Sequence, residues 1–496
     1  MMRHPFVPRL TRLAVTAVTL AVGGSALPTA ALAAAPGGTP SNAYQPKITW
    51  GTCPKPGQGG GEPPVERDER TECGQLEVPV DWSDPGGAKI NLAVARLKAT
   101  DPAQRKGVLM WGPGGPGLQG ASIIGVYDRF SKDVAAAYDV IGYDSRGLGA
   151  NAPRCDKPAA PPMLPASKKE FDQRAAYNRA LGESCRQKTG ALMDHLDSDS
   201  DARDMDALRR ALGEEKLNYQ GASYGTVRGL AYARLFPQHT GRFNLDSSLD
   251  PRAQTSFDKF AGDETAAAER NVRAFLTWWR EKSKDKPKQD PLTIYRKAQD
   301  NARKKGGRYV EDFITSATVG SSSPYGWPDF SKELTGRADG TVPGEPGKPV
   351  PYDPGAQAIF CSDWRGGDQS WDAYRAMLDR LKRENPLVGI SSQAFSIAAS
   401  PASCIGWPGK DRESARTDPP AGAVGQVIGV RNDARTSYTW SRDVARRIGA
   451  SLLTVNDYGH AAYFPATGDG PKSCVTKWVD DYLLTGKKGS SQCAAE

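Results

Sequence analysis

The 496-residue chain has few histidines and lacks several patterns that indicate metal, nucleotide or membrane binding. It has four histidines, and none of its cysteines forms a C-x-x-C pair beside one, which argues against a zinc site. No G-x-x-x-x-G-K-[ST] sequence is present, which argues against a phosphate-binding loop. Beyond the N-terminal region, no segment is apolar enough to cross a bilayer. We therefore expect no cofactor, no metal and no membrane span.

The N-terminus has the features of a signal peptide. Arg3, Arg9 and Arg12 precede the apolar run LAVTAVTLAVGG, and small residues spaced for signal peptidase follow in ALPTAALAAAP. The run is too short for an anchor, and the charged flank disfavours the alternative of a buried N-terminal helix. We predict that residues 1–33 are removed and that the protein is secreted and extracellular.

The net charge is modest. Loss of the three signal-peptide arginines would lower the formal net charge from +8 to +5. Basic and acidic residues are mixed in segments such as REKSKDKPKQD, which is typical of a solvated surface rather than of a nucleic-acid site. We expect no nucleic-acid partner, and the oligomeric state stays open.

The cysteines are even in number, which in an exported chain favours disulfides. Their spacing does not determine the connectivity, and we expect sequential pairing because each pair then closes a local loop. A free catalytic cysteine is the less favoured alternative. The eight residues are Cys53, Cys73, Cys155, Cys185, Cys361, Cys404, Cys474 and Cys493.

Short apolar runs that end in turn residues recur along the chain and predict an α/β fold with a buried parallel sheet. GQLEVPVDW and KINLAVARLKA, separated by SDPGGA, predict a hairpin. The other predicted strands are KGVLMWG, YDVIGYD, KLNYQGA, GRFNLDSSLD, AVGQVIGV and ASLLTVND.

The strand–helix alternation stops between residues 251 and 415, where helical patterns such as ETAAAERNVRAFLTWWREKSK dominate. We therefore predict a helical cap at 251–415, inserted between two parts of one catalytic domain, 34–250 and 416–496.

GASYGT around Ser223 has the G-x-S-x-G pattern of a nucleophile elbow. A predicted strand precedes it, an apolar helical segment follows it, and Gly221 and Gly225 are small enough for a sharp turn that exposes the hydroxyl. The pattern alone does not separate a nucleophile from an ordinary strand-to-helix turn. The distinction depends on whether a base and an acid are available.

Elimination leaves one histidine as the base. His4 lies in the predicted signal peptide, and His195 and His239 lie in segments typical of surface loops. His460, in YGHAAYF, follows the last predicted strand, where a serine-hydrolase fold of this kind places its histidine. An incidental loop histidine is the alternative.

The acid is expected after the preceding strand, so that its carboxylate can orient the imidazole. Asp433, in QVIGVRNDART, occupies that place. Asp443 falls within a predicted helix, and Asp457 is too close to His460 along the chain. An exposed loop aspartate is the alternative interpretation of Asp433.

The glycine-rich segment WGPGGPGLQG follows an early predicted strand and suits an oxyanion hole. Glycines let the backbone approach a tetrahedral intermediate, and Pro113 and Pro116 stiffen the loop. We predict that the backbone amides of Gly115 and Tyr224 are the two donors.

These motifs are accompanied by YDSRGLGAN, LDSSLDP, CSDW and CIGWP. Their order resembles that of the secreted actinobacterial serine peptidases of the tripeptidyl aminopeptidase-like family, which are relatives of proline iminopeptidase. The resemblance covers nearly the whole mature chain. The resemblance implies an α/β-hydrolase fold with a helical cap, a triad of Ser223, Asp433 and His460, and release of short peptides, tripeptides among them, from free N-termini. Two positions depart from the family pattern: Ser145 and Ser437 stand where proline is usual. The second departure bears on the assignment of Asp433.

Two other functions remain open on the sequence: a secreted carboxylesterase with the same triad, and a binding protein that kept the fold. An aminopeptidase needs a carboxylate for the substrate's ammonium group. Glu264 and Glu269 lie in the first predicted cap helix, but we expect them to be ordinary exposed glutamates.

Overall fold

A mixed β-sheet forms the centre of the protein in a computed structural model. The structure describes residues 44–55, 66–126, 129–156, 159–344, 354–364, 367–395, 400–409, 417–464 and 472–494. The predicted signal peptide, residues 1–33, lies outside these residues. From one edge to the other, the described strands are β1 Ile48–Gly51, β2 Thr71–Pro79, β3 Lys89–Leu97, β5 Asp139–Tyr143, β4 Val108–Gly112, β6 Leu217–Ala222, β7 Thr240–Asp246, β8 Gln426–Asn432, β9 Ser451–Tyr458 and β10 Ser491–Cys493.

The strand directions place several loops at one edge of the sheet. Strands β1, β2, β3 and β5 pair antiparallel in that order, and β2–β3 is the predicted hairpin. From β5 through β4 to β10, all neighbours are parallel. Because the carboxyl ends of parallel strands share an edge, the loops after β4, β6, β7, β8 and β9 meet there, as ligand-binding loops do in α/β sheets.

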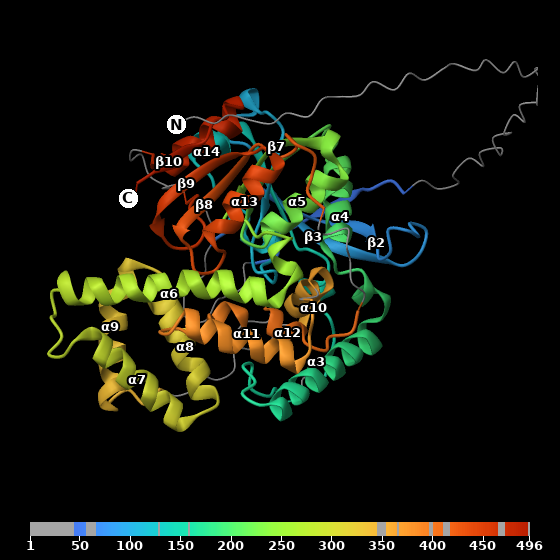
Figure 1. The fold of residues 1–496 in the computed structure, drawn as a ribbon. Helices are drawn as coiled ribbons and strands as arrows, with labels where there is room; N and C mark the ends of the chain where they lie inside the picture. Colours follow the sequence, from blue (N-terminus) through green and yellow to red (C-terminus); the bar gives the residue numbers. More distant parts are fainter. Residues whose placement is uncertain are drawn as a thin grey trace, which may run out of the picture. The chain divides into compact units, whose positions relative to one another are not determined.

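Successive residues of the central strands enter apolar clusters on opposite faces, as the period of two requires. Met110 of β4 and Val427 of β8 belong to one cluster, whereas their neighbours Leu109 and Ile428 belong to the other. The first cluster includes residues of α4 Ser198–Ala211, α5 Gly225–Leu235 and α13 Tyr438–Ile448, and the second includes residues of α1 Gly120–Ile123, α2 Lys132–Ala137 and α14 Cys474–Thr485 (Figure 1).

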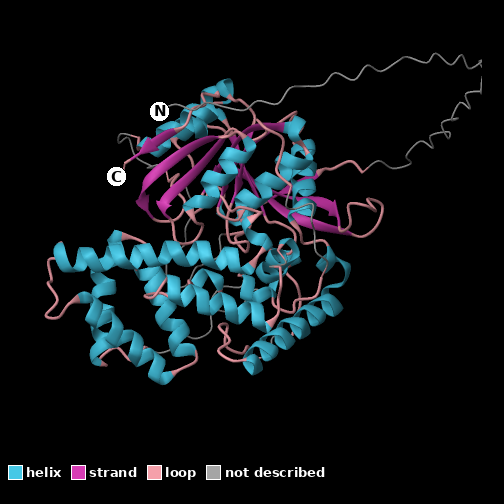
Figure 2. Cartoon of the chain, in the orientation of Figure 1, coloured by secondary structure: helices cyan, strands magenta, loops and turns pink. Residues whose placement is uncertain are grey.

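A layer of helices lies against the carboxyl edge of the sheet, and Figure 2 shows it below the strands. The side-chain amide of Asn271 in this layer donates to the carbonyl oxygen of Asn432 at the end of β8 (3.0 Å). Its helices are α3 Lys168–Thr189, α6 Phe257–Glu281, α7 Pro291–Lys305, α8 Arg308–Gly320, α9 Trp327–Asp339, α10 Pro354–Asp363, α11 Trp371–Glu384 and α12 Pro401–Cys404.

Helix α6 organises this layer. The hydroxyl of Ser256 caps its first turn by accepting from the amide of Lys259, and apolar residues recur along it at helical spacing. Val272 and Phe275 of α6 pack in one large apolar cluster with residues of α7, α8, α9 and α11. Phe171 of α3 joins the same cluster, so the layer also uses a helix that precedes the predicted 251–415 range.

The cysteines pair in sequential order, as expected. Cys53–Cys73 ties the N-terminal segment to β2, Cys155–Cys185 ties a loop to α3, Cys361–Cys404 joins α10 to α12, and Cys474–Cys493 joins α14 to β10. No described cysteine is free.

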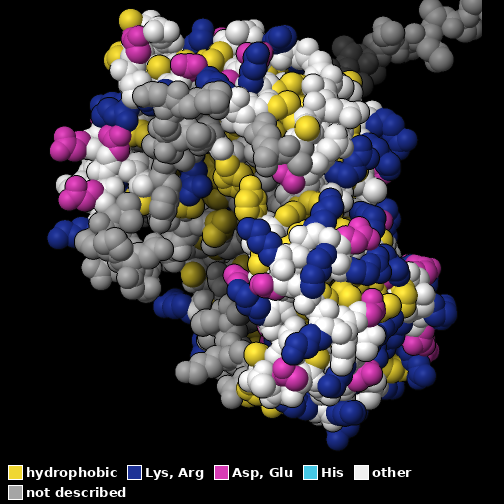
Figure 3. Space-filling view, turned by 90° about the vertical axis from the view of Figure 1, so that its left-hand side faces the viewer, with side chains coloured by type: hydrophobic (Ala, Val, Ile, Leu, Met, Phe, Trp, Pro, Cys, Tyr) yellow, Lys and Arg dark blue, Asp and Glu magenta, His cyan; other side chains and the backbone are white. Residues whose placement is uncertain are grey.

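The described surface mixes charges of both signs. Figure 3 shows Lys and Arg interspersed with Asp and Glu on the face that it presents, and hydrophobic side chains line a recess between the upper and lower parts of that face. Among the described helices, none is long and apolar enough to cross a membrane.

Candidate active site

Ser223 lies on a tight turn between β6 and α5. Its φ angle is 54°, in the left-handed region that non-glycine residues rarely adopt. Its amide donates to the carbonyl oxygen of Asp246 at the end of β7 (2.9 Å), which fixes the turn. A Cβ on Gly225 would lie 2.1 Å from the carbonyl oxygen of Gly112, and one on Gly221 would lie 2.5 Å from the ring of Tyr219. Both glycines of the G-x-S-x-G pattern are therefore required by close packing.

Strained backbone is concentrated around this turn. In the described chain, the non-glycine residues with positive φ are Ser223, Ser247 and Ala461. Ser247 follows β7, and its hydroxyl accepts from the amide of Ala461, the residue after His460 (2.9 Å). Such conformations persist only where the surroundings enforce them, and they are most frequent at functional sites.

The loop after β4 packs directly against Ser223. A Cβ on Gly114 would lie 2.8 Å from the Cβ of Ser223, so only glycine allows this approach. Gly115 has a φ of 115°, and a Cβ there would lie 2.2 Å from the amide nitrogen of Gly117. The backbone of the predicted oxyanion loop is thus beside the predicted nucleophile.

His460 is held by Asp433. Its Nδ1 lies 2.9 Å from Oδ2 and 3.2 Å from Oδ1 of Asp433, which is fully buried. Because a carboxylate can only accept, Nδ1 carries the proton and Nε2 is left as the basic nitrogen. No hydrogen bond joins Ser223 to His460 among the described residues; without substrate, such contacts are often long.

The charge on Asp433 is stabilised despite its burial. Burial raises the pKa of this carboxyl, but the neighbouring imidazole of His460 and the amides of Thr436 and Arg435 outweigh that effect and lower the pKa below its usual value. Oδ1 accepts from both amides, at 2.9 and 2.7 Å respectively. Asp433 therefore stays ionised through the neutral range.

Thr436 is a member of the site that the search for an acid and a base did not assign. Its hydroxyl donates to Oδ2 of Asp433 (2.8 Å) and lies 3.3 Å from Nδ1 of His460. Its place between Asp433 and Ser437, the position where the resembled family usually has proline, was the available signal. Ser437 has a φ of −51°, within the range that proline imposes. The departure therefore leaves the backbone around Asp433 compatible with either residue.

Asp246 was also missed, although it lies in the predicted strand GRFNLDSSLD and in the motif LDSSLDP. Its backbone carbonyl holds Ser223, and its carboxylate accepts from the amides of Ala462 and Tyr463 (both 2.8 Å) just after His460. Burial raises its pKa to about 6. Asp246 thus links the serine turn to the histidine loop across neighbouring strands.

The rejected histidines and acids lie in other contacts. Nε2 of His195 is 3.7 Å from Asp81, and Nδ1 of His239 is 3.1 Å from the carbonyl oxygen of Glu215. Asp443 pairs with Arg442 and Arg446, and Asp457 accepts from the amide of Tyr458.

The expectation that Glu264 and Glu269 are exposed is wrong. Glu269 is buried, pairs with Arg273, and accepts the amides of Leu387 and Val388 (3.0 and 2.9 Å), so it joins α6 to the end of α11. Glu264 is completely buried, neither carboxylate oxygen makes a hydrogen bond of ordinary geometry among the described residues, and the backbone amide of Ser437 is the group that favours its charged form. Burial and the negative charge of Asp433 raise the pKa of Glu264 well above its usual value. The two side chains, five residues apart, leave α6 in different directions, so this part of the helix is buried on more than one side.

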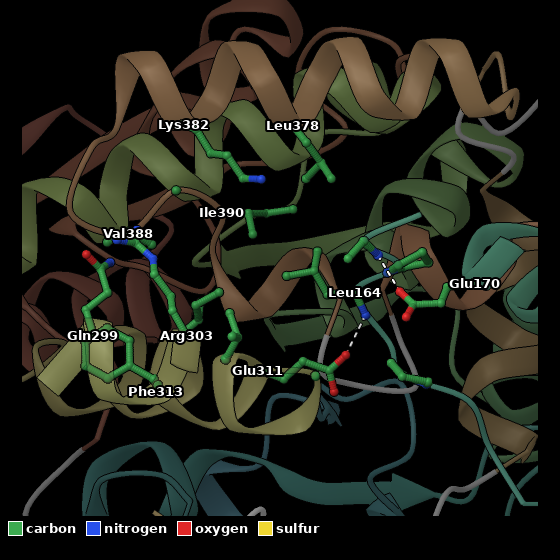
Figure 4. A pocket seen from close by; sticks show the side chains of 18 of the residues that line it. Leu164, Glu170, Gln299, Arg303, Glu311, Phe313, Leu378, Lys382, Val388 and Ile390 are labelled. Carbon is green, nitrogen blue, oxygen red and sulfur yellow. Dashed lines mark hydrogen bonds between the residues drawn. The ribbon is translucent and has the colours of Figure 1, made fainter. Parts of the chain in front are cut away.

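A cavity of about 590 Å³ lies within the helical layer, away from this site. Figure 4 shows Leu378 and Lys382 of α11 facing it across from Glu311, which accepts from the amide of Leu164 (2.6 Å). None of Ser223, Asp433 and His460 lines it.

Comparison with known proteins identifies the family. Residues 112–377, more than half of the chain, match the family model described as alpha/beta hydrolase fold. The chain belongs to the α/β-hydrolase family. Residues 392–493, which include Asp433 and His460, match the model described as TAP-like protein.

Curated relatives of this hydrolase include peptidases and an esterase. It is 28% identical over 460 residues to the tripeptidyl aminopeptidase of Streptomyces lividans. The aligned region covers 84% of this chain and 82% of that protein. It is 26% identical over 474 residues to serine protease Hip1 of Mycobacterium tuberculosis (88% and 89% covered), and 28% identical over 462 residues to carboxylesterase B of the same species (84% of each). Among solved structures, a proline iminopeptidase of Mycobacterium smegmatis is 13% identical with a TM-score of 0.34, covering 83% of this chain and all of that one.

The family models and relatives confirm the predicted α/β-hydrolase fold and the resemblance to tripeptidyl aminopeptidase-like serine peptidases. The protein is a serine hydrolase of this group. The relatives carry both peptidase and esterase names, so they do not by themselves identify the substrate.

Proposed function

We propose that this hydrolase is a secreted aminopeptidase that uses Ser223, Asp433 and His460 to release short peptides, tripeptides foremost, from free N-termini. The observation that supports it best is the pair of the buried Asp433 with the partly exposed His460 at the sheet edge where β6 ends in the strained Ser223 turn. The four disulfides suit an oxidising, extracellular environment.

In the proposed reaction, the hydroxyl of Ser223 attacks the scissile carbonyl while Nε2 of His460 takes its proton. Asp433 orients the ring and stabilises the imidazolium. The amides of Gly115 and Tyr224 donate to the oxyanion. His460 then protonates the departing amine, and water repeats the sequence on the acyl-enzyme.

Glu264 supports a requirement for a free N-terminus. Among the described residues no cation pairs with this buried carboxyl, and a substrate ammonium would pair with it and favour its charged form. Its position on α6, near Asp433, would set the amine close to the reacting carbonyl. Since the side chain is closed off from solvent, the ammonium reaches it only if α6 and the sheet edge separate on binding.

A panel of chromogenic peptides of one to four residues, each with a free or an acetylated N-terminus, tests the function. We expect the free tripeptide to be cleaved fastest and its acetylated partner at least about 100-fold more slowly, because the blocked peptide brings no ammonium group to pair with the buried Glu264 carboxyl. Equal rates would rule out the aminopeptidase. Glu264→Gln should remove the preference, whereas Glu281→Gln, at the exposed end of the same helix, should not.

The second candidate is a carboxylesterase, which the relative of that name favours. Faster turnover of a simple ester than of any free peptide would support it. Ser223→Ala should abolish labelling by a fluorophosphonate under either function, so persistent labelling would contradict the nucleophile itself.

A further inference from the structure

Arg228 of α5 lies behind the loop that carries Gly115. Its side chain is buried, and its two terminal nitrogens donate to the carbonyl oxygens of Pro113 (3.3 Å) and Pro116 (3.2 Å). These two prolines enclose Gly114 and Gly115. One guanidinium therefore ties both ends of the loop to the helix that begins at the Ser223 turn.

Asp201 of α4 holds this guanidinium in place. Its Oδ2 lies 3.0 Å from Nε of Arg228, and both side chains are almost completely buried. Burial raises the pKa of Asp201 and lowers that of Arg228, but for Arg228 the neighbouring carboxylate outweighs burial and raises the pKa. The arginine is therefore charged, with all three of its nitrogens directed at fixed acceptors.

Tyr224, the residue after the nucleophile, is fixed from another direction. Its phenol donates to Oδ2 of Asp363 at the end of α10, and Oδ1 of Asp363 accepts from the amide of Ser198 (2.8 Å). The guanidinium of Arg228 lies 5.5 Å from the centre of the Tyr224 ring. Burial and the nearby Asp363 raise the pKa of the phenol well above its usual value, so it remains a donor.

These polar groups are costly in the interior. A buried ion pair is frequently no more stabilising than apolar residues of the same volume, so stability alone does not explain why charged groups are placed under this loop. The Arg228 contacts end on backbone carbonyls on either side of Gly114 and Gly115, and the Asp363 contact ends on the side chain of Tyr224, whose amide is the other predicted donor. Donors of an oxyanion hole must be fixed before the charge develops.

We propose that Arg228 and Asp363 are positioning residues that hold the two backbone donors of the oxyanion hole in place. The inference rests on the proposed function in taking Gly115 and Tyr224 as those donors. Displaced donors weaken binding of the transition state more than binding of the substrate, so kcat falls while KM changes little.

Tyr224→Phe tests the Asp363 contact, because it removes only the phenol oxygen and keeps the backbone amide. The matched control is Tyr295→Phe, which removes a buried phenol that donates to the carbonyl oxygen of Leu387 (3.0 Å) in the helical layer. For Arg228, the double variant Asp201→Asn/Arg228→Leu removes both partners of the buried ion pair, so no unpaired charge is left. Arg228→Lys keeps the positive charge but lacks the two terminal guanidinium nitrogens that donate to Pro113 and Pro116.

We expect Tyr224→Phe and the double variant to lower kcat about 10- to 100-fold, with KM within about twofold. Affinity for a peptidyl trifluoromethyl ketone, which forms a tetrahedral oxyanion, should fall by the same factor, and Arg228→Lys should recover part of the loss. If Tyr224→Phe matches Tyr295→Phe in kcat, or if the variants lose kcat without losing affinity for the ketone, the proposal is wrong.

Each variant is measured with both a chromogenic ester and a free tripeptide. An oxyanion hole serves either substrate, so a wild-type protein that hydrolyses only the ester would refute the peptidase function, while the ester rates would still decide the role of Arg228 and Asp363.

Discussion

At the scale of single residues, each oxygen of Asp433 has a defined set of donors. Oδ1 accepts two backbone amides, and Oδ2 accepts the Thr436 hydroxyl and the His460 ring nitrogen. In Asp433→Asn one of these oxygens becomes an amide group that faces donors, which favours the wrong tautomer of His460. We expect kcat to fall about 10³- to 10⁴-fold with KM nearly unchanged, measured with the preferred substrate. A loss below about tenfold would assign the acid to another residue.

Thr436→Val isolates the hydroxyl contact to Asp433 without changing the shape of the side chain. The carboxylate loses a donor, so it orients His460 less strictly and its pKa rises. We expect kcat/KM to fall about tenfold, by analogy with the loss of one hydrogen bond to a charged group. Thr439→Val, three residues along the same segment, removes a hydroxyl that contacts only Ser437 in the described chain and should have little effect. Equal effects of the two variants would show that Thr436 acts through local stability alone.

The sequence predicted those candidate site residues whose chemistry is tied to a local pattern. Ser223 was recognisable from its flanking glycines, and His460 by elimination among few histidines. Asp246, Arg228 and Asp363 were not, because each acts through a contact between segments far apart in the chain. A buried aspartate and an exposed one look the same in a sequence when no local period distinguishes them.

At the scale of elements, the apolar runs predicted the central strands, whereas β1 and β10 were not predicted. Both lie at the sheet edges, and β10, Ser-Gln-Cys, is short and mostly exposed, so neither has the apolar run on which the prediction depends. The assignment of α3 to the helical layer could not be read from its own sequence either. It depends on Phe171 meeting α6 and α11 in space.

The Cys361–Cys404 disulfide joins α10, which carries Asp363, to α12 in the helical layer. It spans 43 residues, for which loop-closure entropy gives about 4 kcal/mol of stabilisation. We expect Cys361→Ser/Cys404→Ser to lower the free energy of unfolding by up to this amount and to lower kcat as well, measured by denaturant titration and steady-state kinetics. Cys474→Ser/Cys493→Ser, remote from Asp363, should lower stability and leave kcat unchanged. A reversal of this contrast would contradict the link between α10 and the site.

At the scale of the whole molecule, the dependence of stability on pH depends on the buried carboxyls. Burial raises the pKa of Asp363 to about 7, and the nearby charge of Asp197 acts in the same direction. Hydrogen bonds from the amide of Ser198 and the phenol of Tyr224 lower this pKa but do not outweigh burial. In the unfolded chain its pKa returns to about 3.8. Between these values the folded protein retains a proton that the unfolded chain has lost. The contribution of Asp363 to stability is therefore complete below about pH 4 and is lost as the pH rises to about 7.

We therefore expect the free energy of unfolding to contain a term from Asp363 that falls by about 1.4 kcal/mol per pH unit between about pH 4 and 7 and then levels off. Other carboxyls contribute to the total slope, so the measurement is the difference between wild type and Asp363→Asn in denaturant titrations at several pH values. Asparagine stays neutral, so this difference should change across the window and become constant above it. Asp443→Asn, at a partly exposed carboxyl that pairs with Arg442, is measured alongside as the same substitution at the surface. A difference that is flat across the window would mean that Asp363 is ionised in the folded protein and that its contact with Tyr224 is charge-assisted throughout the neutral range.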